Sequence, residues 1–362
     1  MSKKVMVAMS GGVDSAVAAY LLSKQNYDCI GITMKLFNNE DVFVSREKSC
    51  CSLEDVEDAR SVAFRLKMPY YVFNFKDDFD EKVIKGFIDA YENGLTPNPC
   101  IDCNRYIKFE RLFWRAKELE FDYIATGHYV RIEKDETSNR YLLKKAVDET
   151  KDQSYVLYSM TQEQLAHTLF PLGGLKKSEV RQIAQEQEFR NADKHESQDI
   201  CFVVDGDYKK FIESYTNKTY PEGDFIDENG NVLGKHKGLI SYTTGQRKGL
   251  GIAHESPLYV KSKDMEKNTI TLSEEKGLYS TSFYVNNLNW IAFDKLTQPV
   301  KVKAKIRYRQ SEQPAVIYPH DEESVKVVFD EPQRAITTGQ AAVFYDGDIV
   351  VGGGTISSVL TC

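Results

Sequence analysis

The 362-residue chain is predicted to form an α/β domain with a doubly wound parallel sheet, followed by a small β-rich central domain and a C-terminal antiparallel β-barrel. Apolar, strand-like runs alternate with helix-like runs through the first half, an order typical of parallel sheets with right-handed crossovers. From about Thr219, closely spaced glycines and an Asn-Gly turn indicate hairpins, and short strands recur from Phe283 onward. We expect domains over residues 1–205, 206–279 and 280–362.

The first half is expected to contain four strands, each followed by a helix. The strands are expected at Val5–Met9, Cys29–Met34, Tyr70–Phe75 and Tyr123–Thr126, and the helices at Ser15–Gln25, Leu53–Leu66, Phe79–Glu92 and Ile107–Glu120. Further helices are expected at Thr161–His167, Ser178–Glu188 and Tyr208–Tyr215. The strands of the barrel are expected at Phe283–Trp290, Val300–Arg309, Ala315–Pro319, Ser324–Phe329, Gln340–Tyr345 and Ile349–Ile356.

A glycine loop, Ser10–Ser15, follows the first strand and opens the first helix. Such a turn aims backbone N–H groups and a positive helix end at an anion, and two adjacent glycines let the backbone approach phosphate oxygens. The loop lacks the lysine of a P-loop and the third glycine of a dinucleotide fingerprint. Its order, hydroxyl-Gly-Gly-x-Asp-Ser, resembles the pyrophosphate loop of ATP pyrophosphatases, which cleave ATP between the α and β phosphates.

Ligands of parallel sheets bind beyond the carboxyl ends of the strands. The loop, Met34 after the second strand and Gly127 after the fourth all lie at that edge of the predicted sheet. The residues expected to bind ATP are Ala8, Met9, Ser10, Gly11, Gly12, Val13, Asp14, Ser15, Met34 and Gly127. Asp14 could help to place Mg²⁺, or it could cap the first helix.

Composition limits the classes of function. With 47 basic and 54 acidic residues the formal net charge is −7, so the chain as a whole is no polybasic nucleic-acid binder, although local basic patches could bind phosphates. No apolar stretch approaches the roughly 18 residues of a membrane helix. The first apolar run breaks after about five residues, which is too short for a secretory signal. We therefore expect a cytoplasmic protein with no membrane partner.

Seven cysteines in a chain without a secretory signal favour catalytic, redox or metal roles over a disulfide framework. Cys100 and Cys103 form a Cys-x-x-Cys pair after two prolines. A helix is expected to begin near Ile107, so its N-terminus and nearby cations would lower the pKa of the Cys103 thiol. The pair could instead be half of a zinc site that His195 and Cys201 complete. Alone, Cys201 is typical of a small core residue.

The sequence resembles the bacterial tRNA-specific 2-thiouridylases over essentially its whole length. The matching stretches are VAMSGGVDSAVAA, NPCIDCNRYIKF, DYIATGHY, KDQSYVL, SQDICFV, TTGQRKGLGI, AKIRYRQ and TTGQAAVFY. That family uses ATP and Mg²⁺ to replace the 2-oxygen of the wobble uridine of certain tRNAs with sulfur delivered as a persulfide. Adenylation makes the uracil oxygen a good leaving group, and the loop would hold the departing diphosphate. The resemblance implies tRNA and a sulfur-relay or cysteine desulfurase donor protein as partners.

By this resemblance Cys201 carries the persulfide, and Cys103 is the nucleophile that completes the transfer, which would leave a Cys103–Cys201 disulfide. We expect the segment around Cys201 to be mobile, because a loop must bring the two cysteines together. Some family members have an aspartate with an acid/base role where this chain has Cys100, so that role is open here. The alternative is a [4Fe–4S] cluster held by Cys100, Cys103 and Cys201.

The resemblance also implies residues that contact RNA. Those beside the target base would be Asn98, Pro99 and Cys100, and those touching tRNA would be His128, Lys151, Asp152, Gln153, Arg307, Tyr308 and Gln340. From the residues alone, five cations at every second position would share one face of a strand and bind phosphates: Lys301, Lys303, Lys305, Arg307 and Arg309. His128 could equally be a packed turn histidine, and Gly245–Gly249 a plain hairpin or a second RNA contact.

Two other functions share some of these features. A small-molecule ligase of the argininosuccinate synthetase type would have the ATP loop, but it leaves the pair Cys103 and Cys201 and the basic strand unexplained. A redox or zinc-dependent RNA-binding protein would have no use for the loop. The sequence therefore favours ATP-dependent thiolation of tRNA.

Overall fold

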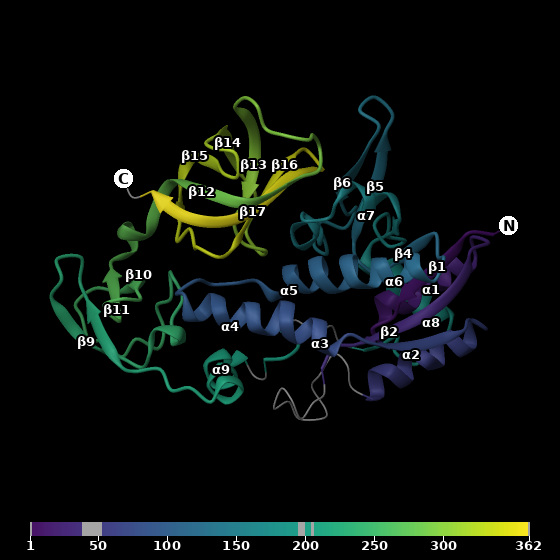
Figure 1. Ribbon diagram of the computed structural model, residues 1–362, viewed down its shortest axis with the longest axis horizontal. Helices are drawn as coiled ribbons and strands as arrows, with labels where there is room; N and C mark the ends of the chain where they lie inside the picture. The colour runs from purple at the N-terminus through teal and green to yellow at the C-terminus, as the bar shows by residue number, and fades with distance from the viewer. Residues whose placement is uncertain (1, 38–52, 195–199, 204–205, 361–362) are drawn as a thin grey trace. The chain divides into compact units, whose positions relative to one another are not determined.

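The computed structural model describes residues 2–37, 53–194, 200–203 and 206–360 (Figure 1). The chain forms two compact units. The first consists of Met1–Ile84, Pro99–Gly206 and Gly347–Val351, and the second of Lys85–Asn98, Asp207–Asp346 and Gly352–Cys362.

A five-stranded parallel sheet lies at the centre of the first unit, in the order β3-β2-β1-β4-β7. Its strands are β1 (Lys4–Ala8), β2 (Asp28–Lys35), β3 (Tyr70–Asn74), β4 (Tyr123–Ala125) and β7 (Thr168–Leu169). The four strands expected in the first half are thus confirmed, while the short β7 was not expected. Because β1 lies between β2 and β4, the segments that follow these three strands emerge side by side at one edge.

Helices α1 (Val13–Ser23), α2 (Leu53–Arg65) and α8 (Lys177–Glu186) pack against this sheet (Figure 1). Their apolar residues join those of β1 in one core that contains Val5, Val17, Val62 and Val180, each at most 2% exposed. α1 buries seven of its eleven residues, which explains why its sequence reads as an almost continuous apolar run rather than an amphipathic stripe.

Two longer helical stretches contain π-helical segments. The first runs through α3 (Lys76–Phe79), η1 (Asp80–Ile84) and α4 (Lys85–Glu92), and the boundary between the units falls after η1. The second runs through α5 (Pro99–Asp102), η2 (Cys103–Arg111) and α6 (Leu112–Glu118). The expected start near Ile107 was wrong: the helical conformation begins at Pro99, because proline is well suited to the first position of a helix. π-Helical turns are rare and occur frequently at functional sites.

The first unit also contains a hairpin that was not expected, formed by β5 (Val130–Asp135) and β6 (Arg140–Lys145). Its strands are rich in charged residues and mostly half-exposed, so they lack the apolar alternation that predicts strands. The remaining helical elements are η3 (Ser154–Leu157) and α7 (Gln162–Ala166), of which α7 was expected.

The second unit contains a four-stranded central sheet in the order β10-β11-β8-β9. The strands are β8 (Gly223–Ile226), β9 (Val232–His236), β10 (Tyr259–Asp264) and β11 (Thr269–Ser273), with α9 (Tyr208–Thr216), η5 (Leu239–Ser241) and η6 (Glu275–Leu278) around them. β8 and β9 form the hairpin that the Asn-Gly turn predicts, and Gly230 adopts a φ of 88° there. The expected β-rich central domain is therefore confirmed.

The strands that follow along the chain form a closed antiparallel barrel in the order β12-β15-β14-β13-β16-β17, with β17 pairing back to β12. Its strands are β12 (Tyr279–Trp290), β13 (Val300–Lys305), β14 (Gln313–Pro319), β15 (Val325–Arg334), β16 (Ala341–Asp346) and β17 (Ile349–Leu360). The expected barrel is thus confirmed. One boundary was wrong: β13 ends at Lys305 rather than at Arg309, because the chain bends from Ile306, which is buried at 1% exposure.

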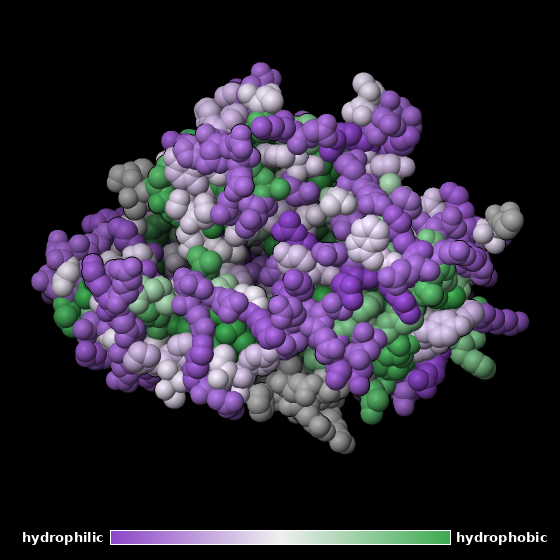
Figure 2. Space-filling model, viewed as in Figure 1, coloured by the Kyte–Doolittle hydropathy of each residue, from purple (hydrophilic) through white to green (hydrophobic). Residues whose placement is uncertain are grey.

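The face of the molecule drawn in Figure 2 is largely hydrophilic, and apolar residues reach the surface in the region where Figure 1 draws α2. Leu53 and Phe64 of that helix are 82% and 85% exposed. Within the described ranges, no helix combines the length and apolar character that crossing a membrane requires.

Candidate active site

The glycine loop is built to present backbone N–H groups at the start of α1. Gly12 is the residue before the helix, and in the described part of the chain this cap position brings no side-chain hydrogen bond to the first N–H groups. Gly11 has a φ of +76°, and a Cβ there would lie 2.5 Å from the carbonyl oxygen of Asp55, so only glycine fits. Ser15 holds the turn from inside, since its Oγ donates to the Gly12 carbonyl at 3.0 Å and accepts from the Ser10 N–H at 3.1 Å. An uncapped helix start of this kind fits phosphate oxygens.

Asp14 is held by two residues that sequence reasoning missed. Lys177 at the start of α8 contacts both carboxylate oxygens through its Nζ, at 2.7 and 2.8 Å, and the Tyr129 hydroxyl donates to Oδ1 at 2.7 Å. The Asp14 side chain does not cap the helix, because Gly12 occupies the capping position. The carboxylate also does not fit a direct Mg²⁺ ligand in this arrangement, because both oxygens already bind an ammonium group.

The structure brings the expected ATP-binding residues together. A Cβ on Gly127 would lie 2.8 Å from both the carbonyl carbon of Asp14 and the nitrogen of Ser15, so the segment after β4 touches the loop. On the other side of β1, the Thr33 hydroxyl donates to the Met9 carbonyl at 2.7 Å, which places the Met34 segment beside the loop. The convergence of the three strand ends is therefore present in the structure. ATP binding by these residues stays a prediction.

The two cysteines of the Cys-x-x-Cys pair lie in the first turns of the helical stretch that begins at Pro99. Cys100 occupies its second position and is exposed, whereas Cys103 is the first residue of η2 and is half-buried. The expectation that Cys103 lies at a helix N-terminus is therefore corrected, because the earlier start makes Cys100 the N-terminal thiol. The effect of the helix dipole falls off within the first turn, so it acts mainly on Cys100.

The Cys201 segment packs against a helix that also contacts the other cysteine segment. Phe202, 1% exposed, places its ring edge-on to Phe79 of α3 with 5.7 Å between centroids. α3 and η1 in turn contact η2, which begins with Cys103. The two cysteine segments thus share one neighbouring helix. Cys201 itself is half-buried in a turn closed by a hydrogen bond from Val203 N to Ile200 O at 3.0 Å.

The expected mobility around Cys201 stays a prediction. Residues His195 to Asp199 lie outside the described part of the chain, as do Cys50 and Cys51. In the part that is described, no three His, Cys, Asp or Glu side chains gather in a way that could hold a metal ion. The described thiols of Cys100, Cys103 and Cys201 therefore do not form a metal-binding group in this arrangement.

Asp102 lies between the two cysteines and was not singled out from the sequence. Burial raises the pKa of its carboxyl group to about 6, although the nearby Arg105 lowers it. Burial also raises the pKa of the Cys29 thiol in β2 to about 11, so that cysteine is a packing residue, as its place in a strand predicts.

Several expected RNA contacts have structural roles here. His128 is 8% exposed between Phe109 and Phe170, and burial lowers its pKa well below the ordinary value, with a smaller contribution from Lys108. In this structure His128 is thus a packed turn histidine, and its contact with tRNA stays a prediction. The Thr126 hydroxyl, 2.6 Å from its Nδ1, completes the turn.

The Lys151–Gln153 stretch is also tied to its own unit. The carboxylate of Asp152 accepts hydrogen bonds from the Ala146 N–H at 3.0 Å and from the Ser154 hydroxyl at 2.6 Å. The Gln153 amide oxygen accepts from the Tyr129 N–H at 3.0 Å. A role in tRNA binding by this stretch stays a prediction.

In the second unit, Arg307 supports the backbone. Its guanidinium donates to the Ala335 carbonyl at 2.6 Å and to the Thr337 hydroxyl at 3.1 Å, and Ala335 is a buried residue with a φ of 51°. The five-cation face was therefore wrong: only Lys301, Lys303 and Lys305 belong to β13, since Arg307 and Arg309 follow its end. Tyr308 is 39% exposed, with the Lys305 ammonium 5.7 Å from its ring centroid.

Gln340 holds the segment that leads to the target-base residues. Its Nε2 donates to the Thr96 carbonyl at 2.7 Å and to the Pro97 carbonyl at 3.3 Å, and the Thr96 N–H donates to the Thr338 carbonyl at 3.0 Å. Asn98 follows directly within the second unit, and Pro99 and Cys100 begin α5 in the first. The observed role of Gln340 is thus to position backbone, and its contact with tRNA stays a prediction.

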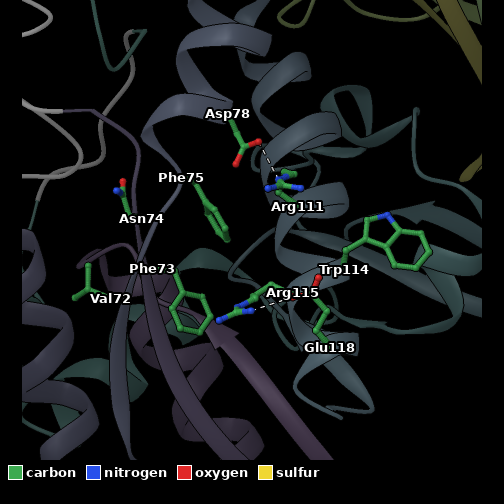
Figure 3. A pocket seen from close by; sticks show the side chains of 9 residues that line it. All are labelled: Val72, Phe73, Asn74, Phe75, Asp78, Arg111, Trp114, Arg115 and Glu118. Carbon is green, nitrogen blue, oxygen red and sulfur yellow. Dashed lines mark hydrogen bonds and ion pairs between the residues drawn. The ribbon is translucent and has the colours of Figure 1, made fainter.

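A cavity of about 330 Å³ lies between β3 and the helical stretch η2–α6 (Figure 3). Its lining residues are Val72, Phe73, Asn74, Phe75, Asp78, Arg111, Trp114, Arg115 and Glu118. Figure 3 shows Arg111 turned toward Asp78 and Arg115 toward Glu118, each pair 2.9 Å apart. None of the residues that the sequence predicts to bind ATP or carry sulfur lines this cavity.

Three known families match successive parts of the chain. The family described as tRNA methyl transferase HUP domain matches residues 3–205, the tRNA methyl transferase PRC-barrel domain residues 209–274, and the aminomethyltransferase beta-barrel domain residues 280–356. Among solved structures, a 4-thiouridine synthetase–RNA complex with bound ATP is 18% identical with a TM-score of 0.37, over 59% of this chain and 50% of that chain. A TM-score this low supports no inference.

Curated relatives match the chain from end to end. The tRNA-specific 2-thiouridylase MnmA of Clostridioides difficile (strain 630) is 53% identical over 360 residues, which cover 99% of both chains. The protein of the same name from Acetivibrio thermocellus is 55% identical over 355 residues, covering 98% of this chain and 99% of that one. With such identity over its full length, and with the glycine loop and both cysteine segments in one unit, the chain belongs to the tRNA-specific 2-thiouridylase family.

Proposed function

We propose that the protein uses ATP to adenylate O2 of the wobble uridine of tRNA and then replaces that oxygen with sulfur. The observation that supports this most directly is the combination, in one compact unit, of an uncapped glycine loop with two cysteine segments on a shared helix. The loop fits a diphosphate leaving group, and thiols are the groups that can carry and release sulfur.

In the first step, O2 of the uridine attacks the α phosphate, and pyrophosphate leaves into the N–H groups at the start of α1. The backbone N–H groups at Gly12 and the following residues stabilise its charge. Lys177 and Tyr129 hold Asp14, and Ser15 holds Gly12, so the loop does not need to rearrange as charge develops. Mg²⁺, when bound to the phosphates, would neutralise further charge.

In the second step, the terminal sulfur of a Cys201 persulfide attacks C2, and AMP leaves. The Cys103 thiolate then attacks the Cys201 Sγ, which releases the 2-thiouridine and forms a Cys103–Cys201 disulfide. A thiol reductant and a protein that donates persulfide sulfur are needed to restore Cys201. Cys100, as the exposed N-terminal thiol of the helix, is the group available for proton transfer.

Several finer assignments belong to the same proposal. We propose that the domains are residues 1–205, 206–279 and 280–362, and that the reaction takes place in the cytoplasm. Asn98, Pro99 and Cys100 would lie beside the uridine, which must leave its stack to reach them. Tyr308 and the exposed Lys301 and Lys303 would contact the tRNA backbone or bases.

The test is sulfur transfer to tRNA by the wild type and by Cys100→Ser, Cys103→Ser and Cys201→Ser, with AMP release measured in parallel. We expect Cys201→Ser to adenylate the uridine and release pyrophosphate without AMP, because no persulfide can displace AMP from C2. Cys103→Ser should release AMP for at most one turnover, and neither variant should form 2-thiouridine. Cys29→Ala is the matched control, since that thiol is buried and should leave thiolation intact. If Cys201→Ser thiolates tRNA normally, the persulfide assignment is wrong. AMP formation with an amino acid instead of tRNA would favour a small-molecule ligase.

A further inference from the structure

Asn191, which follows α8, reaches the glycine loop. Its Nδ2 donates to the Gly11 carbonyl at 2.8 Å, and the residue is 3% exposed. Neither the sequence motifs nor the reaction proposed above uses this residue. It is nevertheless a side chain outside the loop that binds the backbone of the loop at its strained glycine.

This hydrogen bond fixes the direction of a neighbouring N–H group. In a trans peptide, the carbonyl of one residue and the N–H of the next point in opposite directions. The peptide between Gly11 and Gly12 is trans. Because Asn191 draws the Gly11 carbonyl to one side, the Gly12 N–H must point to the other side, away from Asn191.

The Oδ1 atom of Asn191 indicates that the hydrogen bond to Gly11 is the reason for an asparagine at this position. Asn191 Oδ1 is buried and has no hydrogen-bond partner among the residues that the structure describes. A buried amide oxygen without a partner is costly, and an apolar side chain of the same size would avoid that cost. The Nδ2–Gly11 bond is therefore what the amide contributes that leucine could not.

Lys194 binds α2, the helix against which the glycine loop packs. Its Nζ lies 2.7 Å from the carboxylates of both Asp55 and Asp58 on α2, whose side chains are 12% and 6% exposed. The Gly11 Cα packs against the backbone of Asp55. Asn191 and Lys194 also belong to one turn, in which Lys194 N donates to Asn191 O at 3.1 Å. One short segment thus holds Gly11 through its carbonyl and through its neighbour on α2.

We propose that Asn191 is a positioning residue of the diphosphate-binding loop, with Lys194 fixing the α2 backbone against which the loop rests. The proposal rests on the proposed function only in that the loop binds ATP. It assigns to Asn191 the orientation of the Gly12 N–H toward the β and γ phosphates. Asn191 does not touch the substrate, and its effect is confined to the diphosphate portion of the nucleotide.

The test compares nucleotides with and without the diphosphate. Affinities of ATP, pyrophosphate and AMP are measured by calorimetry for the wild type, Asn191→Leu and Asn191→Gln, the last of which keeps an N–H donor. We expect Asn191→Leu to weaken ATP and pyrophosphate about three- to tenfold, the range for one neutral hydrogen bond, while AMP changes less than twofold. Asn191→Gln should recover part of the loss.

Val180→Ala is the matched control, because it opens a cavity in the neighbouring α8 without touching Gly11. It should lower stability and leave the ratio of ATP to AMP affinity unchanged. The proposal is overturned if Asn191→Leu weakens AMP as much as ATP, or if it changes neither. If Asn191→Leu does not fold, the same ratio in Asn191→Gln decides. A wild type that binds ATP but does not thiolate tRNA would overturn the proposed function and leave this assignment standing.

Discussion

Replacing Gly127 with alanine tests the contact between the segment after β4 and the glycine loop. The added Cβ would lie 2.8 Å from both the carbonyl carbon of Asp14 and the nitrogen of Ser15, whereas ordinary contacts begin at 3.4 Å. Both neighbours are backbone atoms at the start of α1, so no side chain can turn away. Either the loop or the Gly127 segment must move by about 0.6 Å.

Overpacking of this kind typically costs about 1–3 kcal/mol of the free energy of unfolding. For a unit of this size that corresponds to a Tm about 2–12 °C lower. A displacement approaching 1 Å at a reacting group can reduce the rate about 10²-fold, so we expect kcat/KM for tRNA thiolation to fall about ten- to a hundredfold. Thermal unfolding and single-turnover AMP release measure the two effects.

Gly174→Ala is the matched control, since a Cβ there meets nothing within 4 Å. It should change the free energy of unfolding by no more than about 0.5 kcal/mol and leave AMP release unchanged. If Gly127→Ala has the same stability and the same rate of AMP release as Gly174→Ala, the contact between Gly127 and the loop contributes nothing to either. The inference that the strand ends converge on this loop would then be wrong.

Three further changes test the charged groups. Lys177→Met should lower the free energy of unfolding by about 1–3 kcal/mol, less than the ~3–5 kcal/mol of a fully buried ion pair because Asp14 is 29% exposed. Lys176→Met is the control and should leave the free energy of unfolding unchanged. Equal urea midpoints for the two variants would contradict the prediction. Arg307→Met should lower the free energy of unfolding by about 1.5–3 kcal/mol, because the hydrogen bond of the guanidinium to the Ala335 carbonyl is lost. If the variant is as stable as the wild type and only binds tRNA more weakly, the structural role of Arg307 is refuted. The pKa of Asp102, about 6, exceeds its unfolded value of 3.8, so the native state binds the proton more tightly and ionisation destabilises it as pH rises. Asp102→Asn should therefore be more stable than wild type by about 1–3 kcal/mol at pH 7.5, and the gap should shrink toward pH 4.5 in urea unfolding; a constant gap would show that the carboxyl does not titrate as inferred.

The sequence was sufficient for the parts of the fold that depend on local patterns. Val5–Met9 was expected as a strand and Lys4–Ala8 forms one, because a buried parallel strand reads as a short apolar run bounded by a turn. The barrel strands were predicted from short strand-like runs that recur with turns between them. The hairpin β5–β6 was missed because its charged, mostly half-exposed strands lack the apolar alternation that predicts strands, although the two strands pair with each other.

The same distinction applies to the site. Gly11 and Gly12 could be found from the sequence, because a turn after a strand demands glycine. Lys177 and Asn191 could not, since each lies more than 160 positions from its partner in the loop and neither belongs to a motif: Lys177 begins α8, and Asn191 lies in the turn that follows it. For Arg307 the alternating cations were a real pattern, but the bend at Ile306 removed it from the strand. The period-two pattern does not show where β13 ends, because Ile306, the apolar residue just beyond the strand, is also buried.

The start of the helix at Pro99 changes how the cysteine pair is understood. With a start near Ile107, Cys103 would have lain just before the helix, where the dipole stabilises a thiolate. With the start at Pro99, Cys100 takes that position and is the more exposed of the two. The helix dipole therefore acts mainly on Cys100. Cys103 is the first residue of the π-helical segment η2, which contacts α3, the helix whose Phe79 packs against Phe202. The two thiols thus differ in environment: Cys100 is exposed at the start of the helical stretch, whereas Cys103 is half-buried in the segment that contacts α3 and η1.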